Sequence, residues 1–215
     1  MQAQPITQDN NYSFKIGDFV RDASAEQFYM VVKPKTQTHD GTLAILQISY
    51  LEWNYRLTYC PYSKTVSKDG GCRIKTNAYN RNNGENNTEL IQTLYDELES
   101  EEHDPWGCPP PIHKFPAFTF VRRLKEDAYI PAIEELYDIF NNANLKYRLF
   151  SLINTCQPDS ISEDENIKIW SSTDNINKNR FDEEALSLLT GPNITPIVQS
   201  IRKAEKAYVF PFKRF

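Results

Sequence analysis

The segment from His103 to His113 groups side chains that could bind a metal. Two of the chain's three histidines lie there, with four residues between each of them and Cys108. Zn²⁺ takes about four nitrogen or sulfur ligands in a tetrahedron, and Cys60 or Cys72 could complete such a set. Structural zinc sites usually pair their ligands two to four residues apart, and this proline-rich segment has no such pair. We therefore predict no metal and no cofactor, and keep a metal-dependent hydrolase that uses His103, Cys108 and His113 as an alternative.

Motifs for nucleophilic or nucleotide chemistry are absent from the sequence. It has no Gly-x-Ser-x-Gly elbow, no His-Glu-x-x-His pair and no Walker phosphate loop. Its 7 glycines leave few positions for the close backbone approach that phosphate loops need. Three histidines supply few general bases near neutral pH. A catalytic triad can be assembled from distant residues, so an enzyme stays an alternative, but we expect a non-catalytic protein.

Charge and aromatic rings gather at the C-terminal end. The whole chain carries 24 basic and 29 acidic residues, a net charge of −5 that argues against a general DNA-coating protein. Residues 201–215 nevertheless hold five basic residues against Glu205 alone, a net charge of +4, with four aromatic residues between them. Proteins that bind single-stranded nucleic acid combine cations and rings in this way. The candidate RNA contacts are Arg122, Arg123, Arg148, Arg202, Lys203, Lys206, Lys213 and Arg214.

The same C-terminal residues have a structural interpretation. Cations favour the C-terminal end of a helix, and alternating aromatic side chains can form the buried face of a closing strand.

Residues 82–114 carry the opposite charge: they contain eight acidic residues and one basic residue, a net charge of −7. We predict a patch for a basic protein partner there, or else a solvated helix face. The patch consists of Asp96, Glu97, Glu99, Glu101 and Glu102.

The elements that must position these residues begin with short strands. After a flexible lead-in at residues 1–11, apolar runs predict strands over residues 16–21, 27–33, 43–48 and 53–59. Gly17-Asp18 stands at the first of them, and the layout resembles SH3-like barrels of the Tudor or KOW type. That resemblance implies a small antiparallel β-barrel over residues 12–66.

A helix and a proline-rich connector follow. Leu90, Leu94 and Leu98 recur with helical spacing and predict a helix over residues 88–101. This helix lies inside a linking region at residues 67–116, whose last twelve residues include five prolines. Beyond it we predict a strand at 117–122, a helix at 129–143, strands at 146–153 and 167–170, helices at 182–189 and 195–206, and a strand at 207–212. This order is similar to the ferredoxin-like split-βαβ arrangement. The predicted fold class is therefore α+β, with a second domain at residues 117–215.

Composition limits the compartment and the class. Four cysteines are scattered without a close pair, which is typical of a reduced intracellular protein. No apolar run approaches the roughly 18 residues of a membrane span, and the first residues lack the pattern of a secretory signal. We predict a cytoplasmic, non-catalytic binding or adaptor subunit of a larger assembly, with protein partners and with RNA as a further partner, as in a nucleoprotein complex. A bridging adaptor that contacts only proteins is the other alternative.

Overall fold

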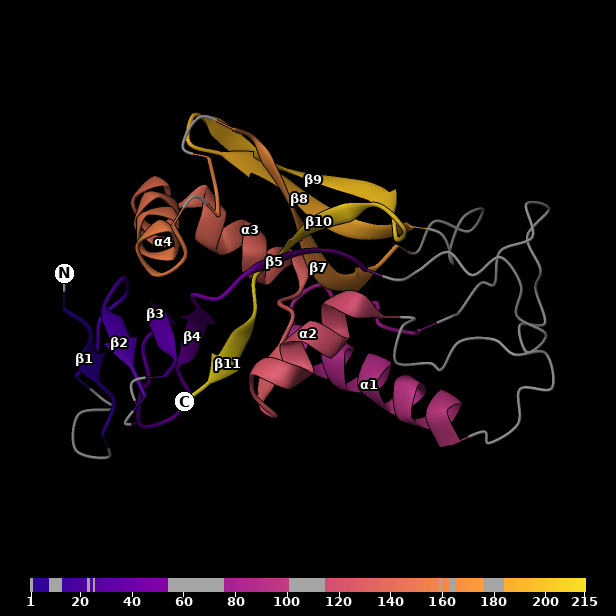
Figure 1. The fold of residues 1–215 in the computed structure, drawn as a ribbon, viewed down its shortest axis with the longest axis horizontal. Helices are drawn as coiled ribbons and strands as arrows, with labels where there is room; N and C mark the ends of the chain where they lie inside the picture. The colour runs from indigo at the N-terminus through magenta and orange to yellow at the C-terminus, as the bar shows by residue number, and fades with distance from the viewer. Residues whose placement is uncertain are drawn as a thin grey trace.

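The computed structural model describes residues 2–7, 13–22, 24, 26–53, 76–100, 115–158, 160–162, 165–175 and 184–215. These residues form two β-sheets and four helices (Figure 1). The helices are α1 (Gly84–Ser100), α2 (Pro116–Leu124), α3 (Ile133–Asn141) and α4 (Ala143–Cys156).

The six-stranded sheet begins with the N-terminal strands and is completed by the end of the chain. Its order is β1 (Gln4–Pro5), β2 (Phe19–Arg21), β3 (Phe28–Lys33), β4 (Thr42–Ile45), β11 (Phe212–Arg214) and β6 (Ala128–Tyr129). Strands β2, β3 and β4 form an antiparallel meander, in which β3 and β4 are almost wholly buried. Phe212 of β11 then pairs with Ala44 on one side and with Tyr129 on the other. The last strand of the chain therefore lies inside this sheet.

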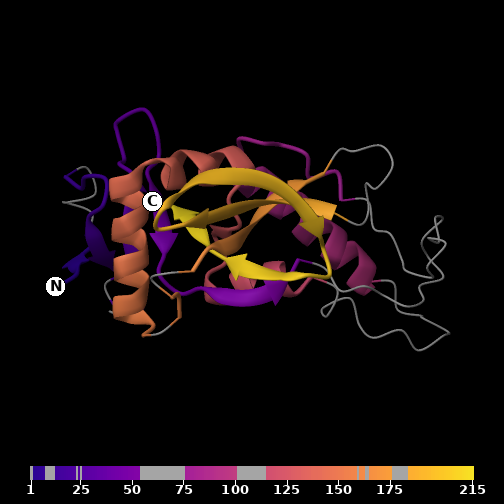
Figure 2. The same ribbon diagram turned by 90° about the horizontal axis from the view of Figure 1, so that it is seen from above.

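The five-stranded sheet is also built from both ends of the sequence. Its order is β5 (Ser49–Glu52), β10 (Lys206–Val209), β7 (Ile167–Asp174), β8 (Glu184–Gly191) and β9 (Ile194–Arg202). Tyr208 of β10 pairs with Tyr50 of antiparallel β5 and with Ile169 of parallel β7. Figure 2 looks onto this sheet, with the long β8–β9 hairpin beside β7.

The predicted architecture of a small barrel followed by a split-βαβ domain is wrong. The class α+β is right, but neither sheet closes into a barrel in the described part of the chain. The physical reason is that β4 and β5 take partners from the C-terminal end, β11 and β10, instead of closing on other N-terminal strands. Both sheets therefore contain strands from before residue 66 and after residue 117.

Two predicted strands are helices. Residues 117–122 belong to α2, where Pro116 stands at the start and Ala117, Phe118 and Val121 form one buried face. Residues 146–153 belong to α4, whose N-terminus is capped by Asn142, since its side chain accepts a hydrogen bond from the backbone of Leu145 at 3.1 Å. Short apolar runs fit both periods, and here the helical one prevails. The helix predictions at 88–101 and 129–143 correspond to α1 and α3.

The two helices predicted at 182–189 and 195–206 are the strands β8 and β9. Gly191-Pro192 resembles a helix stop, but it forms the turn of the hairpin. Thr195-Pro196 resembles a helix start, but Pro196 lies in β9, at the edge of the sheet, where a residue without an N–H is tolerated. At the N-terminal side, β2, β3 and β4 match predicted strands, whereas residues 54–59 of the fourth predicted strand lie outside the described residues.

Side chains on neighbouring positions of β7 face two separate cores. Ile169 belongs to a cluster that includes residues of α3 and α4, such as Phe140 and Leu149. Trp170 belongs to a second cluster with residues of α1 and α2, such as Ile91. The five-stranded sheet therefore contributes to one core with each of its faces, as alternation along a strand requires.

The sequence analysis treats residues 117–215 as a separate domain, whereas the pairing of the strands predicts that this part of the chain cannot fold alone. A fragment of residues 115–215 lacks β4 and β5, so β10 and β11 lose their antiparallel partners and expose Val209 and Phe212, which are 0% and 1% exposed in the full chain. We expect this fragment to show no cooperative thermal unfolding by circular dichroism, while the full chain does. Cooperative unfolding of the fragment would restore the division into two domains.

Candidate functional site

Lys203, one of the predicted RNA contacts, is buried in an ion pair. It lies between β9 and β10, and its Nζ is 2.8 Å from Oδ2 of Asp174, the last residue of β7. The side chains of Lys203 and Asp174 are 4% and 1% exposed. Thr76 donates a hydrogen bond of 2.6 Å to the same carboxylate oxygen, and Trp53 lies below the ammonium, 4.5 Å from Nζ to the ring centroid.

Burial and hydrogen bonding act in opposite directions on this carboxylate. Burial raises the pKa of Asp174 above its usual value, while the ammonium of Lys203 and the hydrogen bonds from Thr76 and the backbone of Asn175 oppose that rise. Since the two side chains are almost wholly buried, the ion pair is a structural group rather than a surface contact.

Arg214 joins the end of the chain to two helix N-termini. Its guanidinium lies 3.2 Å from Glu85 in α1 and 3.4 Å from Glu135 in α3, and it donates a hydrogen bond of 2.6 Å to Thr42. It also lies 5.1 Å from the ring centroid of Tyr129. These contacts hold β11 against both helices.

Three other predicted RNA contacts also have partners within the chain. Lys213 forms an ion pair with Asp127 at 3.0 Å, and Lys206 forms one with Glu52 at 3.8 Å. The guanidinium of Arg148 donates a hydrogen bond of 3.2 Å to the backbone carbonyl of Gly17. Arg122 and Arg123 are exposed in the last turn of α2, and Arg202 is exposed at the end of β9. The structure thus distributes the eight residues over several elements, and their binding of RNA stays a prediction.

The predicted acidic patch and metal segment lie largely beyond what the structure describes. Asp96, Glu97 and Glu99 belong to α1, but their side chains are outside the described part, as are Glu101 and Glu102 entirely. The predicted metal ligands His103, Cys108, His113, Cys60 and Cys72 are outside it as well. Among the residues that are described, no group of three His, Cys, Asp or Glu side chains could hold a metal ion. No helix among them is long and apolar enough to span a membrane.

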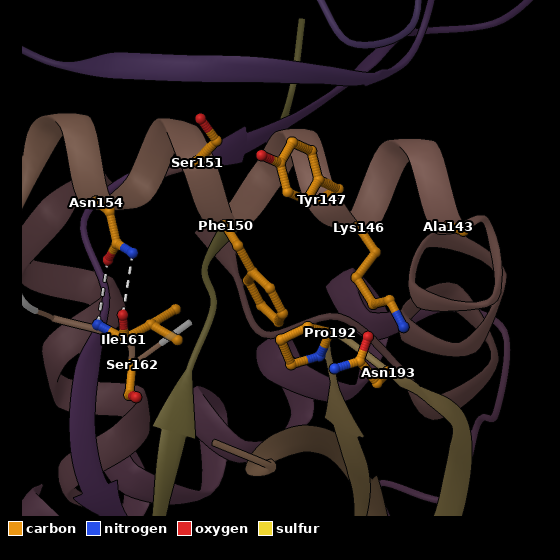
Figure 3. Close-up of a pocket in the computed structure, with 10 residues that line it drawn as sticks. All are labelled: Ala143, Lys146, Tyr147, Phe150, Ser151, Asn154, Ile161, Ser162, Pro192 and Asn193. Atoms are coloured by element: carbon orange, nitrogen blue, oxygen red, sulfur yellow. Dashed lines mark hydrogen bonds between the residues drawn. The ribbon is translucent and has the colours of Figure 1, made fainter. Parts of the chain in front are cut away.

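The structure contains a pocket that the sequence analysis missed. It lies between α4, the turn of the β8–β9 hairpin and the segment before β7, and it encloses about 230 Å³ (Figure 3). Phe150 of α4 points into it opposite Pro192 of the hairpin turn. The other lining residues are Ala143, Lys146, Tyr147, Ser151, Asn154, Ile161, Ser162 and Asn193.

Two side chains of α4 fix the walls of this pocket. Nζ of Lys146 donates hydrogen bonds to the carbonyls of Gly191 and Ile194, at 2.7 and 2.9 Å, and so ties the hairpin turn to the helix. The amide of Asn154 donates to the Ile161 carbonyl at 3.0 Å and accepts from the Ile161 N–H at 3.2 Å. All three walls are therefore joined through α4 before any ligand arrives.

The signal for this pocket was the helical spacing of Lys146, Phe150 and Asn154, which places them on one face of a helix. A strand over residues 146–153 would also put Lys146 and Phe150 on one face, but it would space them about 13 Å apart instead of about 6 Å, and it ends before Asn154. The pocket also needs the β8–β9 turn, which the sequence analysis placed at the end of a helix. Sequence reasoning could have found one wall, but not the contact between α4 and a hairpin about 45 residues away.

Comparison with known proteins gives one informative similarity. No family model matches the chain, and no curated protein matches it. A solved structure, of a fimbrial protein from Bacteroides ovatus ATCC 8483, aligns with a TM-score of 0.50 and 16% sequence identity. The alignment covers 81% of this chain and 36% of that protein, so the chain spans about a third of its neighbour's length. At this identity the similarity concerns the fold alone.

The buried ion pair leads to a stability prediction. Lys203→Met leaves the carboxylate of Asp174 buried without its cation, and we expect a loss of about 3–5 kcal/mol in the free energy of unfolding, measured in urea at neutral pH. The matched control is Lys206→Met, which removes a more exposed ion pair with Glu52 and should cost less than about 1 kcal/mol.

The pH dependence of this variant provides a second readout. Without Lys203, burial holds the pKa of Asp174 above that of the unfolded chain, so the carboxyl of the folded variant takes up a proton more readily. The loss of stability should therefore be smallest at acidic pH and grow as the pH rises through the raised pKa. Equal small losses in the Lys203 and Lys206 variants, independent of pH, would contradict a structural role for the buried pair.

Proposed function

We propose that the protein is a non-catalytic binding subunit of a larger assembly, which it joins through contacts with other proteins. One observation carries this choice over RNA binding. Most of the C-terminal cations predicted to contact RNA are paired with carboxylates of the same chain, as with Lys203, Lys213 and Arg214.

Paired cations contribute less to RNA affinity than free ones. A protein gains affinity for a nucleic acid when its cations neutralise phosphates and release counterions, and a cation held by an internal carboxylate must first lose that partner. The C-terminal rings are similarly engaged: Phe210 and Phe212 are each 1% exposed, which supports a role in the core rather than in stacking on bases.

The fimbrial neighbour supports an assembly made of protein subunits. That protein is described as fimbrial, and a fimbria is a protein filament at the cell surface. By analogy of fold we include a surface filament among the assemblies proposed for this chain. The cytoplasmic location predicted from the cysteines is the competing proposal, and cell fractionation decides between them. In either location, the patch at Asp96, Glu97, Glu99, Glu101 and Glu102 is the proposed contact for a basic partner.

The size of the native particle tests the proposal. In a gentle extract of the source cell, we expect the protein to elute from a sizing column well above its own 25.0 kDa, and to keep that position after ribonuclease treatment. Elution as a monomer would contradict membership of an assembly. A shift to small size with ribonuclease would show instead that RNA holds the particle together.

RNA binding remains the second candidate, because Arg122, Arg123 and Arg202 are exposed. We expect the purified chain to retain little single-stranded RNA in filter binding at physiological salt, and the triple variant Arg122→Ala/Arg123→Ala/Arg202→Ala to behave like its parent. Tight binding that weakens steeply with salt in the parent, and with a flatter slope in the variant, would establish RNA as a ligand. Lys203 is left unchanged in this variant because its removal should destabilise the fold and so confuse the RNA-binding measurement.

A further inference from the structure

Lys146 places a buried positive charge in the wall of the α4 pocket. The residue is 5% exposed, and its Nζ donates to two backbone carbonyls, of Gly191 and Ile194. Carbonyl dipoles satisfy hydrogen bonds but carry no net charge, so the ammonium keeps its full charge in surroundings that disfavour it. Burial accordingly lowers the pKa of Lys146.

Among the residues that the structure describes, Lys146 is a buried lysine without a carboxylate partner, in contrast to Lys203. Lys203 lies against Asp174, whereas no described carboxylate lies within ion-pair distance of Lys146. None of the described residues that line the pocket is acidic. An ammonium has three N–H donors, and the two carbonyls account for two of them. A negatively charged ligand in the pocket would supply the missing charge.

The rest of the lining describes the shape of that ligand. Phe150 and Pro192 present carbon surfaces that face each other across the pocket, as Figure 3 shows. Hydroxyl and amide groups surround them on Tyr147, Ser151 and Asn193, all of them exposed. This combination fits a ring with an apolar face and a hydroxylated edge.

The volume of the pocket suits a single ring. The pocket encloses about 230 Å³, which is the liquid volume of about eight water molecules at roughly 30 Å³ each. Pockets for drug-sized ligands begin near 300 Å³. The walls are already joined by the hydrogen bonds of Lys146 and Asn154, so little ordering accompanies binding.

We propose that this pocket binds one acidic sugar ring, whose carboxylate accepts a hydrogen bond from Lys146 and whose ring packs between Phe150 and Pro192. The hydroxyls of the sugar meet Tyr147 and Asn193 at the rim. This proposal is independent of the assembly proposed above, because it depends only on α4 and the β8–β9 turn.

Two sugars that differ only in the acid group test the proposal. D-glucuronate and D-glucose share the ring and most hydroxyls, but only glucuronate carries a carboxylate. In titrations of the full chain followed by two-dimensional amide NMR, glucuronate should bind saturably and shift the amides of residues 143–162 and 191–194. Glucose should bind at least about tenfold more weakly. Added 0.5 M NaCl should weaken glucuronate binding and leave glucose binding unchanged, since the Debye length falls from about 10 Å at 0.1 M salt to about 3 Å at 1 M and the ion pair is screened accordingly.

The matched variants are Lys146→Met and Lys168→Met. Lys146→Met keeps the length of the side chain without its charge, and it should lower the affinity for glucuronate at least about tenfold and remove the preference over glucose. Lys168 lies in β7, is paired with Glu205 and lines no part of the pocket, so its variant should bind as the parent does. If Lys146→Met fails to fold, Tyr147→Ala, at a side chain 76% exposed, replaces it and should weaken both sugars.

Several results would overturn the proposal. Failure of both sugars to bind the parent would show that the pocket takes no such ring. Equal affinity for glucuronate and glucose, or unchanged glucuronate binding in Lys146→Met, would assign to Lys146 only its structural role of holding the hairpin turn. Shifts confined to amides remote from residues 143–162 and 191–194 would place the sugar elsewhere.

Discussion

The fold depends on the last ten residues of the chain, which enter both sheets between other strands. β10 lies between β5 and β7, and β11 lies between β4 and β6. Between these two strands, the Pro211 carbonyl accepts a hydrogen bond of 2.8 Å from the Ile45 N–H, so pairing with the N-terminal segment continues across the junction. Neither sheet is complete until the C-terminal end has been placed, and this constraint requires the two halves of the sequence to fold together.

Charge placement reinforces that arrangement at two points. At one, the pair of Lys203 and Asp174 meets Trp53 and Thr76 and so links the turn before β10 to residues that flank β5 and α1. At the other, Arg214 reaches Glu135, whose carboxylate also accepts hydrogen bonds from the backbone of Gly84 and Ala132 at 2.9 Å each. A buried ion pair adds little net stability over an apolar replacement, but the loss of one partner is costly. The cations of the basic C-terminal stretch thus stabilise the fold through ion pairs with specific carboxylates of the same chain.

Local patterns in the sequence predict some elements and mislead about others. The N-terminal apolar runs predict β2, β3 and β4, and the spacing of Leu90 and Leu94 predicts α1, because in these segments the apolar residues fit one period only. Residues 117–122 and 146–153 fit either period, and only burial on a helix face decides between them. The turn at Gly191-Pro192 has the same residues as a helix stop, so the hairpin becomes evident only from the pairing of β8 with β9.

The candidate sites depend even more on remote contacts. Residue type alone singled out Lys203 and Arg214 as cations, but their partners lie 29 and 129 positions away, at Asp174 and Glu85. The pocket likewise needs Lys146 and the carbonyl of Gly191, 45 positions apart. A sequence taken alone gives charge and periodicity, whereas pairing between distant segments decides which charges stay free for a partner.

Native-state hydrogen exchange of the full chain tests most directly whether the C-terminal stretch closes the fold. We predict that the hydrogen-bonded amides of β10 and β11 exchange only through global unfolding, with the same free energy of opening as those of β3 and β7. Exchange of β10 and β11 at a much lower free energy than β3 and β7 would contradict the account. It would show that the basic stretch detaches from the two sheets and can present its cations and rings to another molecule.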